Sequence, residues 1–284
     1  NVFELGKGAK YDDVNNIDSL YSVINTIFLE HTRELGETVE KIAEDKSHVI
    51  KTNQLGAFIA EQEPEVLRII IERAEKQGVP ISIYGQDFRA DNIRYTNRGM
   101  LFDVIIKDEL FSDILVPLLG EHQAKNCALA LALCHSILPD WDIFDIKKRL
   151  AQLEWPGRME MISRSPLVLL DACINKNSTE NIRQVLAQLG IEKCVFIVGI
   201  PDDKDYEGVV CSVQGMSEAT ILTKSKNPHY RFTDIQKQRL QEKGITTIGS
   251  NSVEEAISIA KKFNGPVAIL GTTSIISDVK RMKW

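Results

Sequence analysis

The chain has 284 residues, of which 43% are apolar and 26% charged, and this balance excludes collagen-like, coiled-coil and disordered proteins. Its 40 acidic and 34 basic residues give a net charge of −6, which argues against a general nucleic-acid binder, because such a protein needs a basic face. No apolar run reaches the roughly 18–20 residues of a membrane-spanning helix, so we expect no membrane partner.

The five cysteines lie singly inside apolar segments, without a C-x-x-C motif or any paired spacing. This usage is typical of buried free thiols in a reducing compartment, and it predicts a cytoplasmic protein. The five positions are Cys127, Cys134, Cys173, Cys194 and Cys211.

The sequence opens at Asn1 without a methionine or a signal peptide. Val2 and Phe3 precede a glycine-rich turn, and this pattern is typical of the end of a buried strand. We therefore expect either a segment upstream of Asn1 or a fold that has been cut back.

The first half of the chain alternates short apolar runs with amphipathic stretches. Gly78 stands where a helix C-cap is expected, and Asn97-Arg98-Gly99 is typical of a hairpin turn. Trp155-Pro156-Gly157 interrupts the pattern and predicts a boundary between a domain at 1–154 and one at 155–284. The expected elements are strands at 22–29, 57–60 and 79–84, helices at 38–46 and 64–78, a hairpin at 93–106 and a buried helix at 122–138.

After the boundary, short and continuously apolar strands alternate with helices, which predicts a parallel sheet covered on both faces. We expect strands at 167–171, 194–199, 219–223, 245–248 and 267–271, and helices at 178–189 (capped by Asn177 or Ser178), 234–243 and 252–263 (capped by Ser252). In such a fold ligands bind at the carboxyl ends of the strands. Polar and glycine residues gather at these ends, at Asp171, 199–205, 223–225 and 271–273.

Six motifs follow one another along the chain, and their order and separations resemble those of the folylpolyglutamate synthase/dihydrofolate synthase family, within the Mur ligase superfamily. Each motif alone is weak evidence, whereas six in order are strong. They begin at Glu4 (ELGKGAKYDDVN), Glu30 (EHT, then LG and Thr38), Ile42 (IAEDK, then IK), Gly120 (GEHQ, then Asn126), Trp155 (WPGRME) and Val198 (VGI, then DKDY).

The resemblance implies an α/β fold with a truncated Mur ligase central domain at 1–154 and a Rossmann-like Mur ligase C-terminal domain at 155–284. It also implies an ATP- and Mg²⁺-dependent amide ligase of folate biosynthesis. Such an enzyme adds an amino acid, glutamate in the family, to a folate- or pteroate-like acid. It activates the acid as an acyl phosphate, and this chemistry needs metal ions and fixed cations beside the transferring phosphate.

The resemblance also implies roles for single residues. Glu4 and His31 match Mg²⁺ ligands, although an imidazole is less usual than oxygen for this ion. Lys46 matches a catalytic lysine that is carbamylated by CO₂. Asn126 matches a residue that holds the nucleotide. Arg158 matches a nucleotide-binding and catalytic arginine, whose planar guanidinium can donate two hydrogen bonds to phosphate. Asp171 matches an aspartate that contacts ATP in the family.

Without the surrounding motifs, each residue has an ordinary interpretation. Glu4 and Lys46 would be solvated charges, His31 a surface or core histidine, and residues 202–205 a charged loop. Arg158 would simply hold a linker in place. The functional interpretation therefore depends on the ordered set.

The chain also departs from the family pattern. No G-x-x-x-x-G-K-[ST] phosphate loop occurs in the 284 residues. Residues 171–176 read DACINK where the family has D-G-A-H-N-P, so Ile174 replaces a histidine. Isoleucine cannot hydrogen-bond, so we expect a drier site with altered or absent amino-acid binding; the alternative is that Ile174 packs into the core. Further differences are Asn227-Pro228-His229 for N-P-R and Gly271-Thr272-Thr273 for G-S-L.

These departures leave two alternatives to the ligase. The chain is either a non-catalytic family member that binds a ligand or a partner, or one half of a split ligase whose phosphate loop comes from a second polypeptide.

Overall fold

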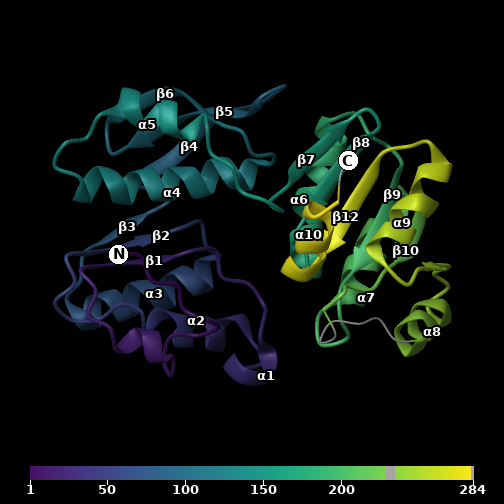
Figure 1. Ribbon diagram of the computed structural model, residues 1–284. Coiled ribbons are helices and arrows are strands. Elements are labelled where there is room, and N and C mark those ends of the chain that lie inside the picture. The colour runs from purple at the N-terminus through teal and green to yellow at the C-terminus, as the bar shows by residue number, and fades with distance from the viewer. Residues whose placement is uncertain (228–233, 283–284) are drawn as a thin grey trace. The chain divides into compact units, whose positions relative to one another are not determined.

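The computed structural model describes residues 1–227 and 234–282, and these form two compact units (Figure 1). Pro228 and His229 of the N-P-H motif lie outside the described residues. The first unit comprises Asn1–Arg94, Leu101–Leu115 and Gln123–Arg149. The second comprises Tyr95–Met100, Val116–His122 and Leu150–Trp284, so it takes in two segments that precede Leu150.

A three-stranded parallel sheet forms the centre of the first unit. Its strands are β1 (Tyr21–Ile24), β2 (Gly56–Ile59) and β3 (Ile81–Ile83), in the order β1-β2-β3. All four residues of β2 are buried, because helices cover both faces of the sheet. In Figure 1, α2 (Val39–Ser47) and α3 (Pro64–Gln77) lie on one face and α4 (Glu121–Ile137) on the other.

A second sheet, in the order β4-β5-β6, follows the first along the chain. Its strands are β4 (Phe88–Thr96), β5 (Gly99–Ile106) and β6 (Glu109–Val116). The turn between β4 and β5 falls at the predicted Asn97-Arg98-Gly99. The remaining elements of this half are η1 (Asp13–Asn16), α1 (Thr32–Leu35) and α5 (Ile143–Leu150).

The second unit contains a six-stranded sheet in the order β11-β10-β9-β12-β8-β7. Five strands are parallel, and only β7 pairs antiparallel with its neighbour β8. The register aligns the carboxyl ends of the central strands, since Gly271 faces Gly199 and Leu270 faces Asp171. The strands are β7 (Glu160–Arg164), β8 (Leu167–Asp171), β9 (Cys194–Gly199), β10 (Ser217–Leu222), β11 (Ile248–Gly249) and β12 (Val267–Gly271).

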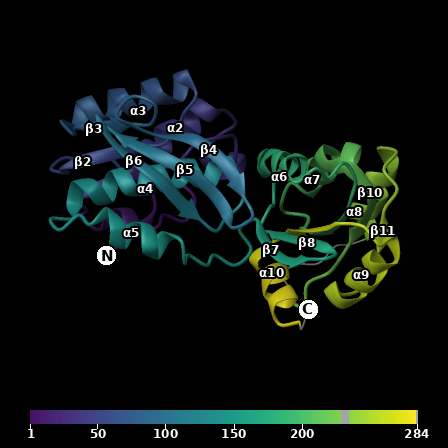
Figure 2. The same cartoon turned by 90° about the horizontal axis from the view of Figure 1, so that it is seen from above.

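Helices cover both faces of this sheet, as the continuously apolar strands predict (Figure 2). Along β9, Cys194, Phe196 and Val198 face one layer, while Val195 and Ile197 face the other. The first layer contains α6 (Lys176–Gln188), α7 (Tyr206–Val213) and α8 (Asp234–Glu242), and the second contains α9 (Val253–Ala260) and α10 (Thr273–Lys280); η2 (Gln214–Met216) and η3 (Lys261–Phe263) are short.

Several predicted boundaries were wrong. The strand expected at 22–29 ends at Ile24, because the next backbone N–H groups donate to side chains and not to a neighbouring strand. Thr26 N donates to the Asn25 side chain, and Ile27 N donates to the Gln62 side chain. Helix α6 begins earlier than expected, because Asn175, and neither Asn177 nor Ser178, is its N-cap and accepts from Ser178 N at 3.0 Å. The helix expected at 252–263 keeps Ser252 as its cap, but its last turn is the 3₁₀ segment η3.

The expectation that Val2 and Phe3 end a buried strand was also wrong. They lie in irregular chain with exposed fractions of 98% and 56%. The thiols are free, as expected, but only Cys173 and Cys194 are buried, and Cys211 is exposed on α7. None of the helices in the described part of the chain has both the length and the apolar character needed to cross a bilayer.

Candidate functional site

The first motif forms a loop that is tied to the end of α2. Asp45 on α2 accepts hydrogen bonds from the backbone N–H groups of Ala9 (2.7 Å) and Lys10 (3.3 Å). Gly8 is required there, because a Cβ atom at this position would lie 2.1 Å from Asp45 Oδ1. Asn15 closes the loop by donating to Ala9 O and to His48 O. The spacing of the first and third motifs therefore has a structural basis.

Lys46, next to Asp45 on α2, meets the second motif at Glu30. Lys46 Nζ lies 2.6 Å from Glu30 Oε1, and His31 Nε2 lies 3.8 Å from Glu30 Oε2. The three side chains are between 24% and 30% exposed, so water reaches the cluster. His31 adopts a left-handed backbone conformation (φ 49°), which is uncommon for a residue other than glycine. The structure thus brings His31 and Lys46 together through a carboxylate that they share.

Glu4 is not part of this cluster. It is exposed, and within residues 1–227 and 234–282 it forms no hydrogen bond or ion pair. The same residues contain no group of three His, Cys, Asp or Glu side chains that is arranged to hold a metal ion. Glu30 and His31 alone offer an oxygen and a nitrogen, so Mg²⁺ would need phosphate oxygens and water for its other ligands, which is how it usually binds.

Asn126 lies on the exposed side of α4, in the first unit. The helix expected to be buried at 122–138 is buried along one side only, at residues such as Ala124, Ala128 and Leu131. The neighbouring Lys125 forms an ion pair with Glu61 at 2.5 Å. Asn126 is therefore a solvent-facing amide on a helix that is fixed to the first unit.

Arg158 is presented by a short turn in the second unit, which we call the Arg158 turn (residues 157–160). Its neighbours Gly157 (φ 70°) and Met159 (φ 48°) both adopt left-handed conformations and both are buried, while Arg158 itself is exposed. Gly157 O accepts from Ala172 N at 2.8 Å, and Met159 N donates to Asp171 Oδ2 at 2.8 Å. The backbone on either side of Arg158 is thus fixed to the carboxyl end of β8, and only the side chain faces solvent.

Two titratable groups lie in the electrostatic field of Arg158. Burial raises the pKa of Asp171 from 3.8 to about 6, against the opposing effects of the Met159 N–H and of Arg158. Burial also lowers the pKa of His122 from 6.5 to about 4, and the positive charge of Arg158 acts in the same direction. At neutral pH the Arg158 guanidinium is therefore a cation with the Asp171 carboxylate and the neutral His122 imidazole in its field.

The carboxyl edge of the sheet carries two buried hydroxyl groups. Thr223 follows β10 and Thr272 follows β12, with exposed fractions of 1% and 8%. Within the described residues neither Oγ1 atom has a hydrogen-bond partner, although Thr272 occupies the N-cap position of α10. Buried hydroxyls without a partner are costly, and such groups often mark a site for water or a ligand.

The loop after β8 contains Ile174, which is half-buried and belongs to neither core cluster of the second unit. The alternative that Ile174 packs into the core is therefore wrong. Nearby, Asp205 accepts from Lys176 N and from Gly208 N, each at 2.9 Å, and so joins the first turns of α6 and α7. Asp205 is a structural carboxylate and not part of a freely solvated charged loop.

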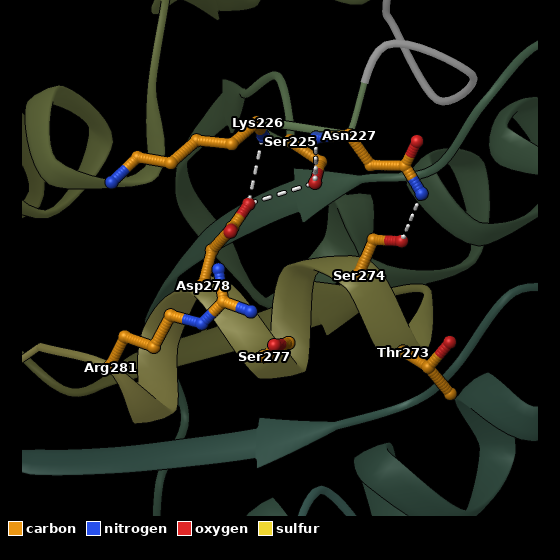
Figure 3. A pocket seen from close by; sticks show the side chains of 8 residues that line it. All are labelled: Ser225, Lys226, Asn227, Thr273, Ser274, Ser277, Asp278 and Arg281. Carbon is orange, nitrogen blue, oxygen red and sulfur yellow. Dashed lines mark hydrogen bonds between the residues drawn. The ribbon is translucent and has the colours of Figure 1, made fainter.

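A polar cavity of about 370 Å³ lies between residues 225–227 and α10 (Figure 3). Asp278, which is 5% exposed, accepts from Ser225 Oγ (2.8 Å) and from Lys226 N (2.9 Å). The Asn227 side chain donates to Ser274 Oγ at 3.1 Å. These bonds fix residues 225–227 against one side of α10. The lining residues are Ser225, Lys226, Asn227, Thr273, Ser274, Ser277, Asp278 and Arg281.

Sequence reasoning missed three residues of these clusters as functional candidates. Glu30 stands in a motif, but its pairing with Lys46 depends on packing between segments 16 residues apart. His122 stands in the Gly120 motif, where nothing in the sequence signals that its Nδ1 atom is buried. Glu160 ends the WPGRME motif, and its partner Lys280 is 120 residues away.

Comparison with known proteins gives these sites a context. A family model described as the Mur ligase middle domain matches residues 1–134. The dihydrofolate synthase/folylpolyglutamate synthase of Bacillus subtilis (strain 168) is 27% identical over 296 residues, and the match covers 99% of this chain and 67% of that protein. The folylpolyglutamate synthase of Lacticaseibacillus casei is 29% identical over 286 residues, covering 99% and 66% respectively.

The chain resembles the folylpolyglutamate synthase/dihydrofolate synthase family of Mur ligases over almost its whole length. The fold agrees: a structure of Mycobacterium tuberculosis folylpolyglutamate synthase complexed with ADP and AMPPCP has a TM-score of 0.88 at 22% identity, covering 98% of this chain and 66% of that one. The chain spans about two thirds of the length of these family members. The family resemblance and the α/β Mur ligase fold expected from the motifs are thus confirmed.

Proposed function

We propose that the protein is an ATP-dependent amide ligase that adds an amino acid to a folate- or pteroate-like acid. The observation that carries the proposal is the Arg158 turn, which holds an exposed guanidinium near the half-buried Asp171 carboxylate at the carboxyl edge of a parallel sheet. Nucleotides bind at this edge in open α/β sheets, and the relatives are named as folylpolyglutamate and dihydrofolate synthases.

In this proposal the residues around the turn bind ATP. The planar guanidinium of Arg158 donates to phosphate oxygens, where charge develops as the terminal phosphate is transferred to the acid. Asp171 holds the turn through Met159 N and stays beside the nucleotide. In the first unit, the solvent-facing amide of Asn126 on α4 remains a proposed nucleotide-binding group.

The cluster at Glu30 is the proposed Mg²⁺ site. Glu30 and His31 supply an oxygen and a nitrogen, and bound Mg²⁺ would neutralise phosphate charge. Carbamylation of Lys46 would replace the Lys46–Glu30 ion pair by two neighbouring anions, an arrangement that suits a divalent cation. Glu4 remains a proposed ligand, which would have to approach this cluster from its exposed loop.

The amino acid would bind at the other polar group on the carboxyl edge. The buried hydroxyl groups of Thr223 and Thr272 can each donate a hydrogen bond to a ligand, whereas the side chain of Ile174, in the loop after β8, cannot. We therefore expect glutamate to bind weakly, and Ile174→His to tighten its binding about ten- to a hundredfold, which is the value of one charge-assisted hydrogen bond to a carboxylate.

The comparisons lend no support to the two alternatives. The relatives are named as synthases, and none of those described above suggests a non-catalytic protein or a second polypeptide. Because the 284 residues contain no phosphate-loop motif, we still expect this chain by itself to release no ADP above background.

Ligand-induced thermal shifts test the proposal, because a ligand that binds the folded state raises the melting temperature. We expect shifts with Mg²⁺-ATP and with a folate- or pteroate-type acid, and a smaller shift with ATP in the variant Arg158→Gln. A chain that no nucleotide stabilises would contradict the ligase. ADP release by residues 1–284 that disappears in Glu4→Ala would contradict only the expectation that this chain alone is inactive.

A further inference from the structure

Helix α10 contacts the Arg158 turn through two residues one helical turn apart. A Cβ atom on Gly157 would lie 2.6 Å from Ile276 Cγ2, so the backbone of the turn lies directly against this side chain. Lys280 Nζ, four residues further along α10, lies 2.6 Å from Glu160 Oε1. Residues four apart share one face of a helix, so a single face of α10 covers both ends of the turn.

Glu160 uses its two carboxylate oxygens for different partners. Oε1 pairs with Lys280, while Oε2 accepts from Gly157 N at 2.9 Å. Gly157 is buried, so this N–H would lose its partner if Glu160 moved away. The side chain of Glu160 is 24% exposed, whereas that of Lys280 is 44% exposed. Lys280 therefore fixes the Glu160 carboxylate, and this carboxylate accepts the Gly157 N–H at the start of the Arg158 turn.

We infer that Lys280 and Glu160 are positioning residues for Arg158, and that α10 sets the direction in which the guanidinium points. An isolated surface ion pair contributes little to stability. This pair differs because its acidic member also accepts the buried Gly157 N–H. Losing it removes one of the two backbone hydrogen bonds that hold Gly157 and leaves only the bond from Ala172 N to Gly157 O. The consequence for nucleotide binding rests on the proposed function, whereas the consequence for the geometry of the turn does not.

The titration of His122 reports the position of Arg158 without any ligand. The positive charge of Arg158 helps to hold the pKa of His122 near 4, so displacing the guanidinium raises that pKa. We expect Lys280→Met and Glu160→Gln each to raise the pKa of His122 by about half a pH unit, measured by NMR with His122→Gln to assign the signal. Lys280→Arg keeps the charge and is expected to restore the wild-type value.

A matched ion pair in the same unit provides the control. Lys243 pairs with Glu207, and the two side chains are 51% and 26% exposed, close to the values for Lys280 and Glu160. Lys243→Met is therefore expected to leave the His122 titration unchanged. Calorimetry with Mg²⁺-ATP adds a second readout, in which Lys280→Met weakens binding two- to fivefold and Lys243→Met does not.

Two results would overturn the inference: a His122 pKa in Lys280→Met equal to that of the wild type, or an equal shift in Lys243→Met. A folded Lys280→Met protein that shows the shift, with rescue by Lys280→Arg, supports it. If the wild-type chain binds no ATP, the proposed function fails, and the His122 titration still decides whether Lys280 and Glu160 position Arg158.

Discussion

The two charged clusters of the protein are built on different principles. At Glu30 in the first unit, each charge has an opposite charge beside it and roughly a quarter of each side chain is exposed. At Asp171 in the second unit, the carboxylate is held by a backbone N–H, with Arg158 acting on it through its field and burial dominating its pKa. The first cluster resembles a surface ion network, whereas the second resembles a site that is shaped before any ligand arrives.

This difference determines what should perturb each cluster. An exposed ion pair is screened by water and salt, so removing one member costs little. A half-buried carboxylate that accepts a hydrogen bond from a strained turn depends on backbone geometry and on its own protonation. We therefore expect the second cluster to respond strongly to a change of backbone or of pH, and the first to respond weakly to both.

The largest expected effect is that of Gly157→Ala. The new Cβ atom would meet Ile276 at 2.6 Å on a backbone with φ 70°, and we expect a loss of roughly 3–4 kcal/mol in the unfolding free energy of the second unit. Urea unfolding monitored by hydrogen exchange at β9 and β12 measures it.

Gly190→Ala is the matched control for this substitution. Gly190 has almost the same φ, 71°, but nothing lies within 4 Å of its Cβ position, so only the backbone strain of about 1 kcal/mol is expected. Equal losses in the two variants would show that α10 does not press on the Arg158 turn.

A smaller effect is expected from pH, with opposite signs at Asp171 and His122. The folded state binds the Asp171 proton more tightly than the unfolded chain does, so this group lowers stability as the pH rises from about 4 to 6. The unfolded chain takes up the His122 proton first, so that group lowers stability as the pH falls from 6.5 to about 4. Each group contributes about 1–3 kcal/mol to the unfolding free energy. In the wild type the two slopes of unfolding free energy against pH have opposite signs.

Single variants should separate these slopes in urea unfolding between pH 4 and 7. Relative to the wild type, Asp171→Asn should lose stability more steeply toward acid, because only the His122 slope remains. His122→Gln should instead lose stability as the pH rises. Asp140→Asn, at an exposed position, is the control with the wild-type profile. Variants whose profiles run parallel to the wild type would refute the assignment of both groups.

The smallest expected effect belongs to the first cluster. Lys46→Met removes the partner of Glu30 and should cost less than about 1 kcal/mol, since both side chains are partly exposed. The loss should shrink further at 1 M salt, where exposed charges are screened. A cost above about 3 kcal/mol in thermal or urea unfolding would mean that this pair is a buried network like the one at Asp171.

The sequence predicted the second unit better than its sites. Strands 194–199 and 267–271 have the expected boundaries, because continuous apolar runs bounded by polar residues leave few alternatives. Helix α10 was missed because its eight residues include two serines and a threonine, which are weak helix formers. The N-cap of α6 was misplaced because three of four consecutive residues, Asn175, Asn177 and Ser178, can each act as a cap and only the folded backbone selects Asn175.

The candidate residues were predicted through motifs, whereas their contacts were not. Local spacing explains why Asp45 and Lys46 lie together on α2. It cannot explain the pairing of Glu160 with Lys280, which depends on β7 and α10 meeting in the folded unit. Nor does spacing predict the pKa of Asp171, because burial is a property of the packed chain.

We propose that the turn at 157–160 holds Arg158 in position for the phosphates of ATP. Calorimetric titration of Mg²⁺-ATP into the 284-residue chain tests it most directly, with Arg158→Gln compared against Arg183→Gln, an exposed arginine on α6. We predict saturable binding that Arg158→Gln weakens about ten- to a hundredfold, the usual value of a charged hydrogen bond to phosphate, and that Arg183→Gln leaves unchanged. Equal affinities for the wild type and both variants would contradict the account.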